Sequence, residues 1–359
     1  MQSIAIVNGS RRNDGITVSN RLFYKVLKEA GYDVKWYQIV DSPNLSDYYV
    51  DGEIIKGVTQ FGYPISNGLN RLIFLTNKSK KIKSDLIYLS DPTLIGLFKG
   101  LGNTIVKFHD FRPLTRFNDR ILAKIMFSYI VKKLRQVNFA LFNSEFTFTD
   151  ARKLGIMPKK GFMIPETVQW EVQKDHVEVS LRNLNNGYLT FTYIATDRKY
   201  KNIDLFLRLS NVEILGIKIR FLLVSNMAKR KAEKVSREFP RVSIISNVTD
   251  IKSIYKQTDV LLHPSLYEGF GRPVIEAMSF GIPVLVSNIK PLKEIVINEA
   301  NLCIPNDIEC WIDKILNITK PKVYRDAAQY SLERFENYSY EKFKQRILSM
   351  MKYFDQTTS

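Results

Sequence analysis

Short apolar, β-branched runs alternate along this chain with longer amphipathic runs. Four such pairs fill the first half: 4–7 with 18–30, 85–89 with 93–101, 104–108 with 120–134, and 139–142 with 146–154. This alternation is typical of β-α-β units, in which consecutive strands run parallel and helices cover the sheet. The sequence therefore predicts an α/β fold built on mostly parallel sheets.

The alternation starts again in the second half, after a polar stretch at 173–186. Its strand-like runs are 189–194, 219–224, 242–245, 260–263 and 283–286. We therefore expect two doubly wound, Rossmann-like domains, residues 1–168 and 169–337, followed by an amphipathic terminal helix over 338–354. Because ligands of open parallel sheets bind outside the carboxyl ends of the strands, we expect a ligand in a cleft between two facing sheets.

The charge balance limits the partners of the chain. Its 359 residues include 53 Lys and Arg against 36 Asp and Glu, so the formal net charge is +17. Such an excess favours nucleic acid, an anionic membrane surface or a phosphate-bearing small molecule as the partner. Composition alone does not choose among the three.

Residue counts exclude several kinds of site. Two cysteines, Cys303 and Cys310, are too few for a disulfide scaffold or a paired-cysteine zinc site, which favours a reducing, cytoplasmic setting. The three histidines show no ligand spacing and no Asp-x-Asp triplet occurs, so the sequence does not call for a bound metal. No run reaches the about 18 apolar residues of a membrane span, and the strand-like Ile4–Val7 does not resemble a signal peptide.

The most informative stretch runs from 258 to 281. A strand-like run ends at His263, a loop with two glycines follows, and Pro273 stands in the expected first turn of a helix. A strand, a glycine loop and a helix start together form a site for an anion such as a diphosphate. Glu268 and Glu276 flank the loop with seven residues between them, and a carboxylate is a good acceptor for the paired hydroxyls of a ribose or hexose.

This block resembles the paired-glutamate (E-x7-E) motif of retaining, nucleotide-sugar-dependent glycosyltransferases of the GT-B fold, the large group 1 family of mannosyl- and glucosyltransferases. The resemblance implies that Glu276 binds the nucleotide ribose. It also implies that Glu268 and the backbone of Gly269-Phe270-Gly271-Arg272 lie near the donor sugar and phosphate. In this fold two Rossmann-like domains face each other across a cleft, and the terminal helix over 338–354 packs back on the first domain.

A second segment resembles the family's first strand and loop of the nucleotide domain. There a basic pair binds the donor diphosphate and offsets the charge that develops on the leaving group. Lys201 matches the lysine of this pair. The usual places of the arginine hold Thr196 and Tyr200, so we assign its role to Arg198.

Three further segments carry the resemblance. His109, after a strand-like run, matches the family's His-Asp segment, which faces the donor sugar. Gly15-Ile16, in the loop after the first strand, matches the glycine loop that approaches the donor sugar and the acceptor. Asn247-Val248 matches the segment whose backbone meets the base, without indicating which base.

The resemblance implies an enzyme that moves a hexose from a UDP- or GDP-sugar to a glycan or lipid-linked acceptor, with retention through a front-face displacement. The implied catalytic residues are Lys201, Arg198, His109 and Glu268. No metal or other cofactor is implied, because basic side chains offset the charge of the leaving phosphate. That phosphate helps to deprotonate the acceptor, so the two glutamates act as binders and not as the acid and nucleophile of a glycoside hydrolase.

Two other interpretations stay open. The loop Asn8–Gly15 also resembles the mononucleotide loop of flavodoxin-like FMN reductases, but that fold explains about half of the chain and leaves Glu268 and Glu276 without a role. A non-catalytic protein with the same fold could bind a sugar nucleotide or a nucleic acid. No recognised nucleic-acid motif accompanies the charge, so we do not expect a nucleic-acid partner.

Basic residues gather in the first half of the chain. The segment Arg120–Leu134 combines apolar residues at helical spacing with Lys124, Lys132 and Lys133. This pattern fits a core helix with a solvated basic edge, and it also fits a peripheral face that docks on anionic lipid, where each Lys or Arg adds about 1 kcal/mol. A lipid-linked acceptor, which many relatives use, favours the membrane-peripheral interpretation.

Overall fold

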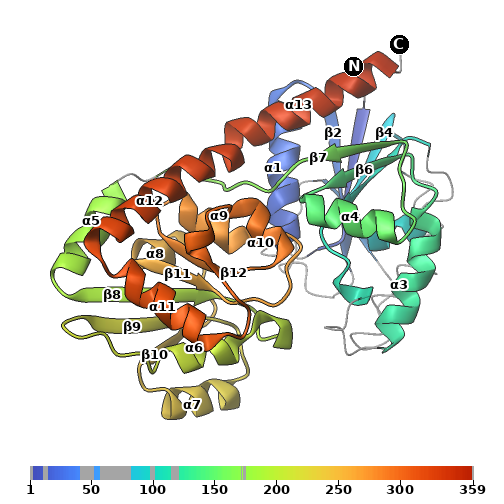
Figure 1. The fold of residues 1–359 in the computed structure, drawn as a ribbon. Coiled ribbons are helices and arrows are strands. Elements are labelled where there is room, and N and C mark those ends of the chain that lie inside the picture. The colour runs from blue at the N-terminus through green and yellow to red at the C-terminus, as the bar shows by residue number, and fades with distance from the viewer. Residues whose placement is uncertain are drawn as a thin grey trace. The chain divides into compact units, whose positions relative to one another are not determined.

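The computed structural model describes residues 3–10, 15–40, 52–56, 82–97, 102–114, 121–170, 172 and 175–357. The chain divides into two compact units (Figure 1). Unit 1 comprises Met1–Glu166 and Tyr340–Ser359, and unit 2 comprises Thr167–Ser339. The expected limits of the second domain were 169 and 337, and the limits of unit 2 are 167 and 339.

Unit 1 is built on a seven-stranded sheet of order β3-β2-β1-β4-β5-β6-β7, whose neighbouring strands pair in parallel. The strands are β1 (Ser3–Asn8), β2 (Asp33–Val40), β3 (Gly52–Lys56), β4 (Leu86–Leu89), β5 (Thr104–Phe108), β6 (Phe139–Phe142) and β7 (Lys160–Met163). The residues of β4 and β5 are all buried; β4 is continuously apolar, whereas β5 includes one charged residue, Lys107.

The helices of unit 1 include the terminal helix of the chain. They are α1 (Gly15–Glu29), α3 (Ile121–Leu134), α4 (Glu145–Lys153) and α13 (Tyr340–Thr357), with the 3-10 helices η4 (Pro92–Leu97) and η5 (Arg112–Leu114). α13 lies beside α1, and its Phe343 and Ile347 share a buried cluster with Phe23 and Val26 (Figure 1). η4 stands where the sequence predicted a longer helix over 93–101, and residues 98–101 lie outside the described ranges.

Unit 2 is built on a six-stranded parallel sheet of order β10-β9-β8-β11-β12-β13. Its strands are β8 (Tyr188–Ile194), β9 (Lys218–Val224), β10 (Val242–Ile245), β11 (Val260–His263), β12 (Val284–Ser287) and β13 (Leu302–Cys303). Its helices are α5 (Asp175–Asn185), α6 (Ile203–Leu209), α7 (Lys229–Glu238), α8 (Ile251–Lys256), α9 (Arg272–Met278), α10 (Lys290–Ile295), α11 (Ile308–Ile318) and α12 (Pro321–Phe335), with the 3-10 helices η6 (Lys199–Lys201), η7 (Glu299–Asn301) and η8 (Glu336–Tyr338).

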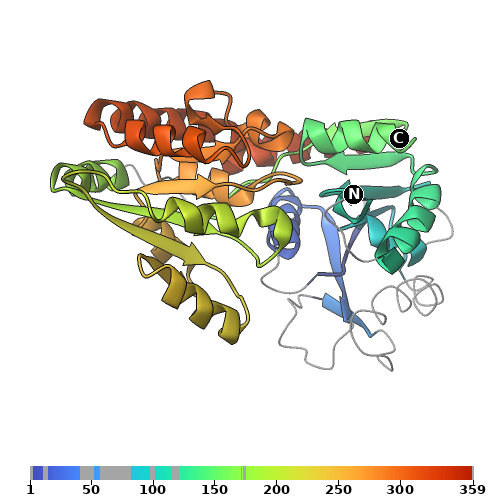
Figure 2. The same ribbon diagram turned by 60° about the horizontal axis from the view of Figure 1, so that its bottom comes forward.

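Helices cover both faces of the unit 2 sheet (Figure 2). α6, α7 and α11 share one buried cluster with Leu189 and Phe191 of β8, whereas α8, α9 and α10 share another with Leu261 of β11 and Val284 of β12. This is the doubly wound α/β architecture that the sequence predicted. Among the helices in the described ranges, none is long and apolar enough to cross a membrane.

Candidate active site

Two of the predicted site residues, Lys201 and Glu268, meet in unit 2. β8 and β11 are neighbouring parallel strands, so their carboxyl ends lie at the same edge of the sheet. Lys201 ends η6 after β8, and Glu268 lies in the loop after β11. Lys201 Nζ donates to Glu268 Oε1 at 2.6 Å, and the two side chains are 14% and 11% exposed. The two residues therefore form a largely buried ion pair.

His263, the last residue of β11, is a third member of this cluster, and the sequence analysis gave it no role. Its Nε2 donates to the same Glu268 Oε1 at 2.8 Å, and its side chain is fully buried. Burial alone would raise the pKa of the Glu268 carboxyl, but the Lys201 ammonium and the His263 N–H outweigh it and hold that pKa well below its ordinary range. Glu268 is therefore ionised at neutral pH, so it accepts hydrogen bonds and has no proton to give.

The loop that carries Lys201 is held by Tyr193 of β8. Tyr193 Oη donates to Lys201 O at 2.5 Å and lies 3.0 Å from Ser265 Oγ. Burial raises the pKa of the Tyr193 phenol well above its ordinary value, so the phenol keeps the proton that it donates. Tyr193 and Ser265 thus fix the two loops that bear Lys201 and Glu268.

Glu276 lies in α9 and has a different set of partners. Tyr255 Oη donates to Glu276 Oε2 at 2.7 Å, and Arg272 Nη2 donates to Glu276 Oε1 at 3.2 Å. Burial, together with the charge of Glu276, raises the pKa of Tyr255 well above its ordinary value. A carboxylate offers about four acceptor positions, so Glu276 can accept further hydrogen bonds from a pair of hydroxyls.

The glycine loop between the two glutamates needs glycine at Gly271. This residue precedes α9 with φ of 123°, and a Cβ atom there would lie 2.7 Å from Leu292 Cδ2. Pro273 occupies the first turn, as predicted, and α9 closes at the predicted Gly281: this residue has φ of 68°, its N–H donates to Met278 O at 2.9 Å, and Ile282 N–H donates to Ala277 O at 3.1 Å.

The other predicted residues of unit 2 lie on loops at the same edge of the sheet. Arg198 directly precedes η6, and its side chain is exposed. Asn247 follows β10 with φ of 54°, and its N–H donates to Asn226 Oδ1 at 2.7 Å. Val248 packs against the buried Val224 and Ile254. Because β8, β9, β10 and β11 are parallel, their carboxyl ends bring these loops to one side of unit 2.

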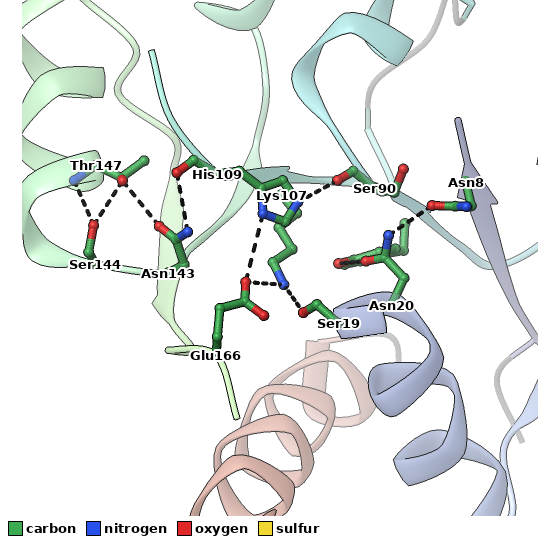
Figure 3. A network of polar contacts seen from close by, with 11 residues as sticks. Asn8, Ser19, Asn20, Ser90, Lys107, His109, Asn143, Ser144, Thr147 and Glu166 are labelled. Carbon is green, nitrogen blue, oxygen red and sulfur yellow. Dashed lines mark hydrogen bonds and ion pairs between the residues drawn. The ribbon is translucent and has the colours of Figure 1, made fainter. Parts of the chain in front are cut away.

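In unit 1, the predicted His109 lies just after β5, within a polar network (Figure 3). Its Nε2 lies 2.8 Å from Ser90 O, and its Nδ1 lies 3.7 Å from Glu166 Oε1. Burial, reinforced by the Lys107 ammonium, lowers the pKa of His109, so the ring is neutral at pH 7. Gly15 and Ile16 begin α1, whereas residues 11–14, with the rest of the predicted glycine loop, lie outside the described ranges.

No group of three or more His, Cys, Asp or Glu side chains suited to a metal ion occurs among the residues that the structure describes. The carboxylates of the predicted site are instead neutralised by protein cations. Lys201 neutralises Glu268, and Arg272 neutralises Glu276.

The sequence and the structure of this chain are both similar to those of known proteins. Residues 178–341 match the family model described as Glycosyl transferases group 1. The O-antigen chain mannosyltransferase RfbU of Salmonella typhimurium is 24% identical over 247 residues, which is 66% of this chain and 65% of that protein. A UDP-Gal:alpha-D-GlcNAc-diphosphoundecaprenol alpha-1,3-galactosyltransferase of Escherichia coli is 38% identical over 85 residues, 23% of this chain and 22% of that protein. The chain therefore spans less than two thirds of the length of these relatives.

Solved structures show the same fold over the whole chain. Sucrose-phosphate synthase from Thermosynechococcus elongatus superposes with a TM-score of 0.80 at 18% identity and covers 100% of this chain and 99% of its own. Anabaena HepE in complex with UDP-glucose superposes with a TM-score of 0.73 at 13% identity and covers 98% of this chain and 100% of its own. These comparisons do not favour the flavodoxin-like alternative. Residues 178–341 therefore belong to the glycosyl transferases group 1 family, and the chain has the GT-B fold.

Proposed function

We propose that this chain transfers a hexose from a UDP- or GDP-sugar to a glycan or lipid-linked acceptor. Two of the relatives that it matches are named as a mannosyltransferase and a galactosyltransferase, and the HepE structure of the same fold holds UDP-glucose. The observation that carries the proposal is the cluster of Lys201, His263 and Glu268 at the carboxyl ends of β8 and β11. That edge is where open parallel sheets bind their ligands.

Each side chain of the cluster has a task in this reaction. The Lys201 ammonium has three N–H donors, and one of them goes to Glu268, so the group can also donate to the donor diphosphate. Arg198, on the same exposed loop, adds a second positive charge. Glu268 accepts hydrogen bonds from the sugar hydroxyls, and Glu276 accepts those of the ribose. Gly269, Phe270, Gly271 and Arg272 contribute backbone contacts to the sugar and the phosphate.

The chemistry that we propose is a front-face displacement with retention and without a metal. An ionised Glu268 that already accepts two charged or polar donors cannot serve as a general acid. The leaving phosphate takes the proton of the acceptor hydroxyl, and Lys201 and Arg198 stabilise the charge that develops on it. His109 contacts the sugar from unit 1, Gly15 and Ile16 lie toward the acceptor, and Asn247 and Val248 meet the base.

The proposal includes docking of unit 1 on an anionic, lipid-bearing surface. α3 leaves two large apolar side chains in water, Ile125 at 62% and Tyr129 at 53% exposure. Lys132, one turn further on the same helix face, is exposed, and Lys133 follows it. Apolar side chains beside lysines are the combination that binds the interface of a membrane with anionic headgroups. This face would bring the enzyme to a lipid-linked acceptor on the cytoplasmic side.

Donor binding tests the proposal without knowledge of the acceptor. UDP- and GDP-hexoses are screened for thermal stabilisation of the chain, because a ligand at 100 times its dissociation constant stabilises the folded state by about 2.7 kcal/mol. We expect stabilisation by at least one nucleotide sugar, and its loss in Glu276→Ala. Stabilisation by FMN, with flavin absorbance in the purified protein, would instead support the reductase alternative.

A further inference from the structure

Lys107 is a buried ammonium in unit 1 to which the proposed reaction gives no task. Its side chain is 2% exposed, and its Nζ lies 2.5 Å from Ser19 Oγ of α1 and 2.9 Å from Glu166 Oε1 (Figure 3). Glu166 is 4% exposed and is the last residue of unit 1 before the chain enters unit 2. Burial of two charges is costly unless they are paired and hydrogen-bonded, so this pair needs an explanation.

The same carboxylate oxygen faces His109. His109 Nδ1 lies 3.7 Å from Glu166 Oε1, and His109 Nε2 lies 2.8 Å from Ser90 O. Because a carbonyl oxygen only accepts hydrogen bonds, Nε2 carries the proton, and Nδ1 of the neutral ring points its lone pair toward the Lys107–Glu166 pair. Ser90 O therefore holds Nε2–H, whereas the unprotonated Nδ1 makes no hydrogen bond to Glu166 Oε1 at 3.7 Å, so the pair acts on the ring through its charges (Figure 3).

Lys107 also ties α1 to β5. Ser19 lies one turn after Gly15, and the next residue, Asn20, is fixed by two further bonds. Asn20 Nδ2 donates to Asn8 Oδ1 at 2.9 Å, and Tyr88 Oη donates to Asn20 Oδ1 at 2.8 Å. A single ammonium therefore joins the first turns of α1, with Gly15 and Ile16, to the strand that ends at His109.

We propose that Lys107 and Glu166 are positioning residues, which hold the start of α1 against β5, the strand that His109 follows. Neither residue touches a substrate. This inference rests on the proposed function, because the use of His109, Gly15 and Ile16 at the sugar and acceptor belongs to that proposal. The pair acts by fixing geometry, and a small misplacement of such groups is costly to a reaction.

The charges that face His109 act on its pKa in opposite directions. Burial lowers this pKa and Lys107 lowers it further, whereas Glu166 and Asp91 raise it. Lys107→Met removes a charge that lowers the pKa of His109, so the pKa rises. Glu166→Gln removes a charge that raises it, so the pKa falls. Both responses, of opposite sign, require that the two charges lie close to the ring.

An NMR titration of the imidazoles in the full chain tests this. The chain has three histidines, and the His109 resonances are those lost in His109→Gln. We expect the pKa of His109 to rise in Lys107→Met, to fall in Glu166→Gln, and to stay unchanged in Lys35→Met, an exposed lysine on β2. An unchanged pKa in both test variants, or shifts of the same sign, would overturn the proposal.

A double variant separates positioning from folding. Lys107→Met/Glu166→Met removes both charges and keeps buried volume, a change that folded proteins commonly tolerate. We expect a folded protein by circular dichroism whose kcat/KM for sugar transfer is lower by up to about 100-fold. Wild-type kcat/KM in this variant would refute the positioning role. If the wild type transfers no sugar while the titrations shift as stated, the failure belongs to the proposed function and not to the placement of Lys107 and Glu166 beside His109.

Discussion

Lys201 Nζ lies 2.6 Å from Glu268 Oε1 although 67 residues separate the two in the sequence. The contact exists because β8 and β11 are neighbours in a parallel sheet, which brings the loops after them together. It links two parts of the proposed donor site. The side chain that would bind the diphosphate also acts, together with His263, to keep Glu268 ionised.

Replacement of Lys201 by Met should weaken binding of the diphosphate and, at the same time, the ionisation of Glu268. Hydrogen bonds to charged groups contribute about 1.5–3 kcal/mol, so we expect kcat/KM for the nucleotide sugar to fall by roughly 10- to 150-fold. The neighbouring Lys199→Met is the control, because it removes an equal charge from the same exposed loop. Equal losses in the two variants would show that only the overall charge of the loop matters. Steady-state kinetics on both variants and on Arg198→Met decide this.

Gly271→Ala should destabilise unit 2 and weaken donor binding. The residue has φ of 123°, and the added Cβ would lie 2.7 Å from Leu292 Cδ2, so strain and overlap add. We expect a loss of about 1–3 kcal/mol in the free energy of unfolding. Gly102→Ala is the control, since a Cβ there meets no atom within 4 Å. Urea unfolding that shows the same stability for both variants would contradict this account of the loop.

Acidification should destabilise the protein below about pH 6.5. Burial lowers the pKa of His109, His176 and His263 in the folded state, so the unfolded state binds more protons once the pH falls below the ordinary histidine range. Each histidine contributes a slope of about 1.4 kcal/mol per pH unit until the pH reaches its folded pKa. Glu268, with a lowered pKa, adds its own loss only below the ordinary carboxyl range.

Unfolding free energies measured between pH 7 and 5 test this slope. Of the three histidines, His176 is the one outside the proposed site. His176→Gln should therefore reduce the slope of unfolding free energy against pH by the contribution of about one proton. A stability that does not change over this interval would mean that the histidines titrate normally in the folded protein.

Reversal of charge on α3 should weaken binding to anionic vesicles. Lysines near such a surface contribute about 1 kcal/mol each, so loss of two amounts to at least about 30-fold in affinity for Lys132→Glu/Lys133→Glu. The effect should fade as salt rises, because screening shortens the range of the attraction. Lys229→Glu/Arg230→Glu on α7 makes the same charge change in unit 2 and serves as the control. Vesicle sedimentation that separates neither variant from wild type would refute docking through α3.

The sequence predicted the architecture well where the local pattern is strong. The alternation of apolar and amphipathic runs led to two doubly wound units, and the family match at 178–341 agrees with the motif around Glu268 and Glu276. The sequence analysis did not predict β3 (Gly52–Lys56). This strand lies at the edge of the sheet, and its sequence lacks the continuous apolar run that marks a buried central strand.

Side chains that support the site escaped the sequence analysis. Tyr255, which holds Glu276, lies in the short helix α8 and is fully buried, so it resembles a core residue. His263 was noted only as lacking metal-ligand spacing, although its position at the carboxyl end of β11 next to Glu268 was a usable signal. The pairing of Lys107 with Glu166 depends on the order of β5, β6 and β7 in the sheet, and no local pattern encodes that order.

The central claim is that the chain consumes a nucleotide sugar at the Lys201, Glu268 and Glu276 site. The most direct test measures release of nucleoside diphosphate from UDP- and GDP-hexoses, with and without glycan or lipid-linked acceptors. We predict release from at least one donor by the wild type, a drop of at least about 10-fold in Glu276→Ala, and no change in Glu233→Ala, an exposed glutamate on α7. Folded wild-type protein that releases no nucleotide from any donor, or Glu276→Ala at the full rate, would contradict the claim.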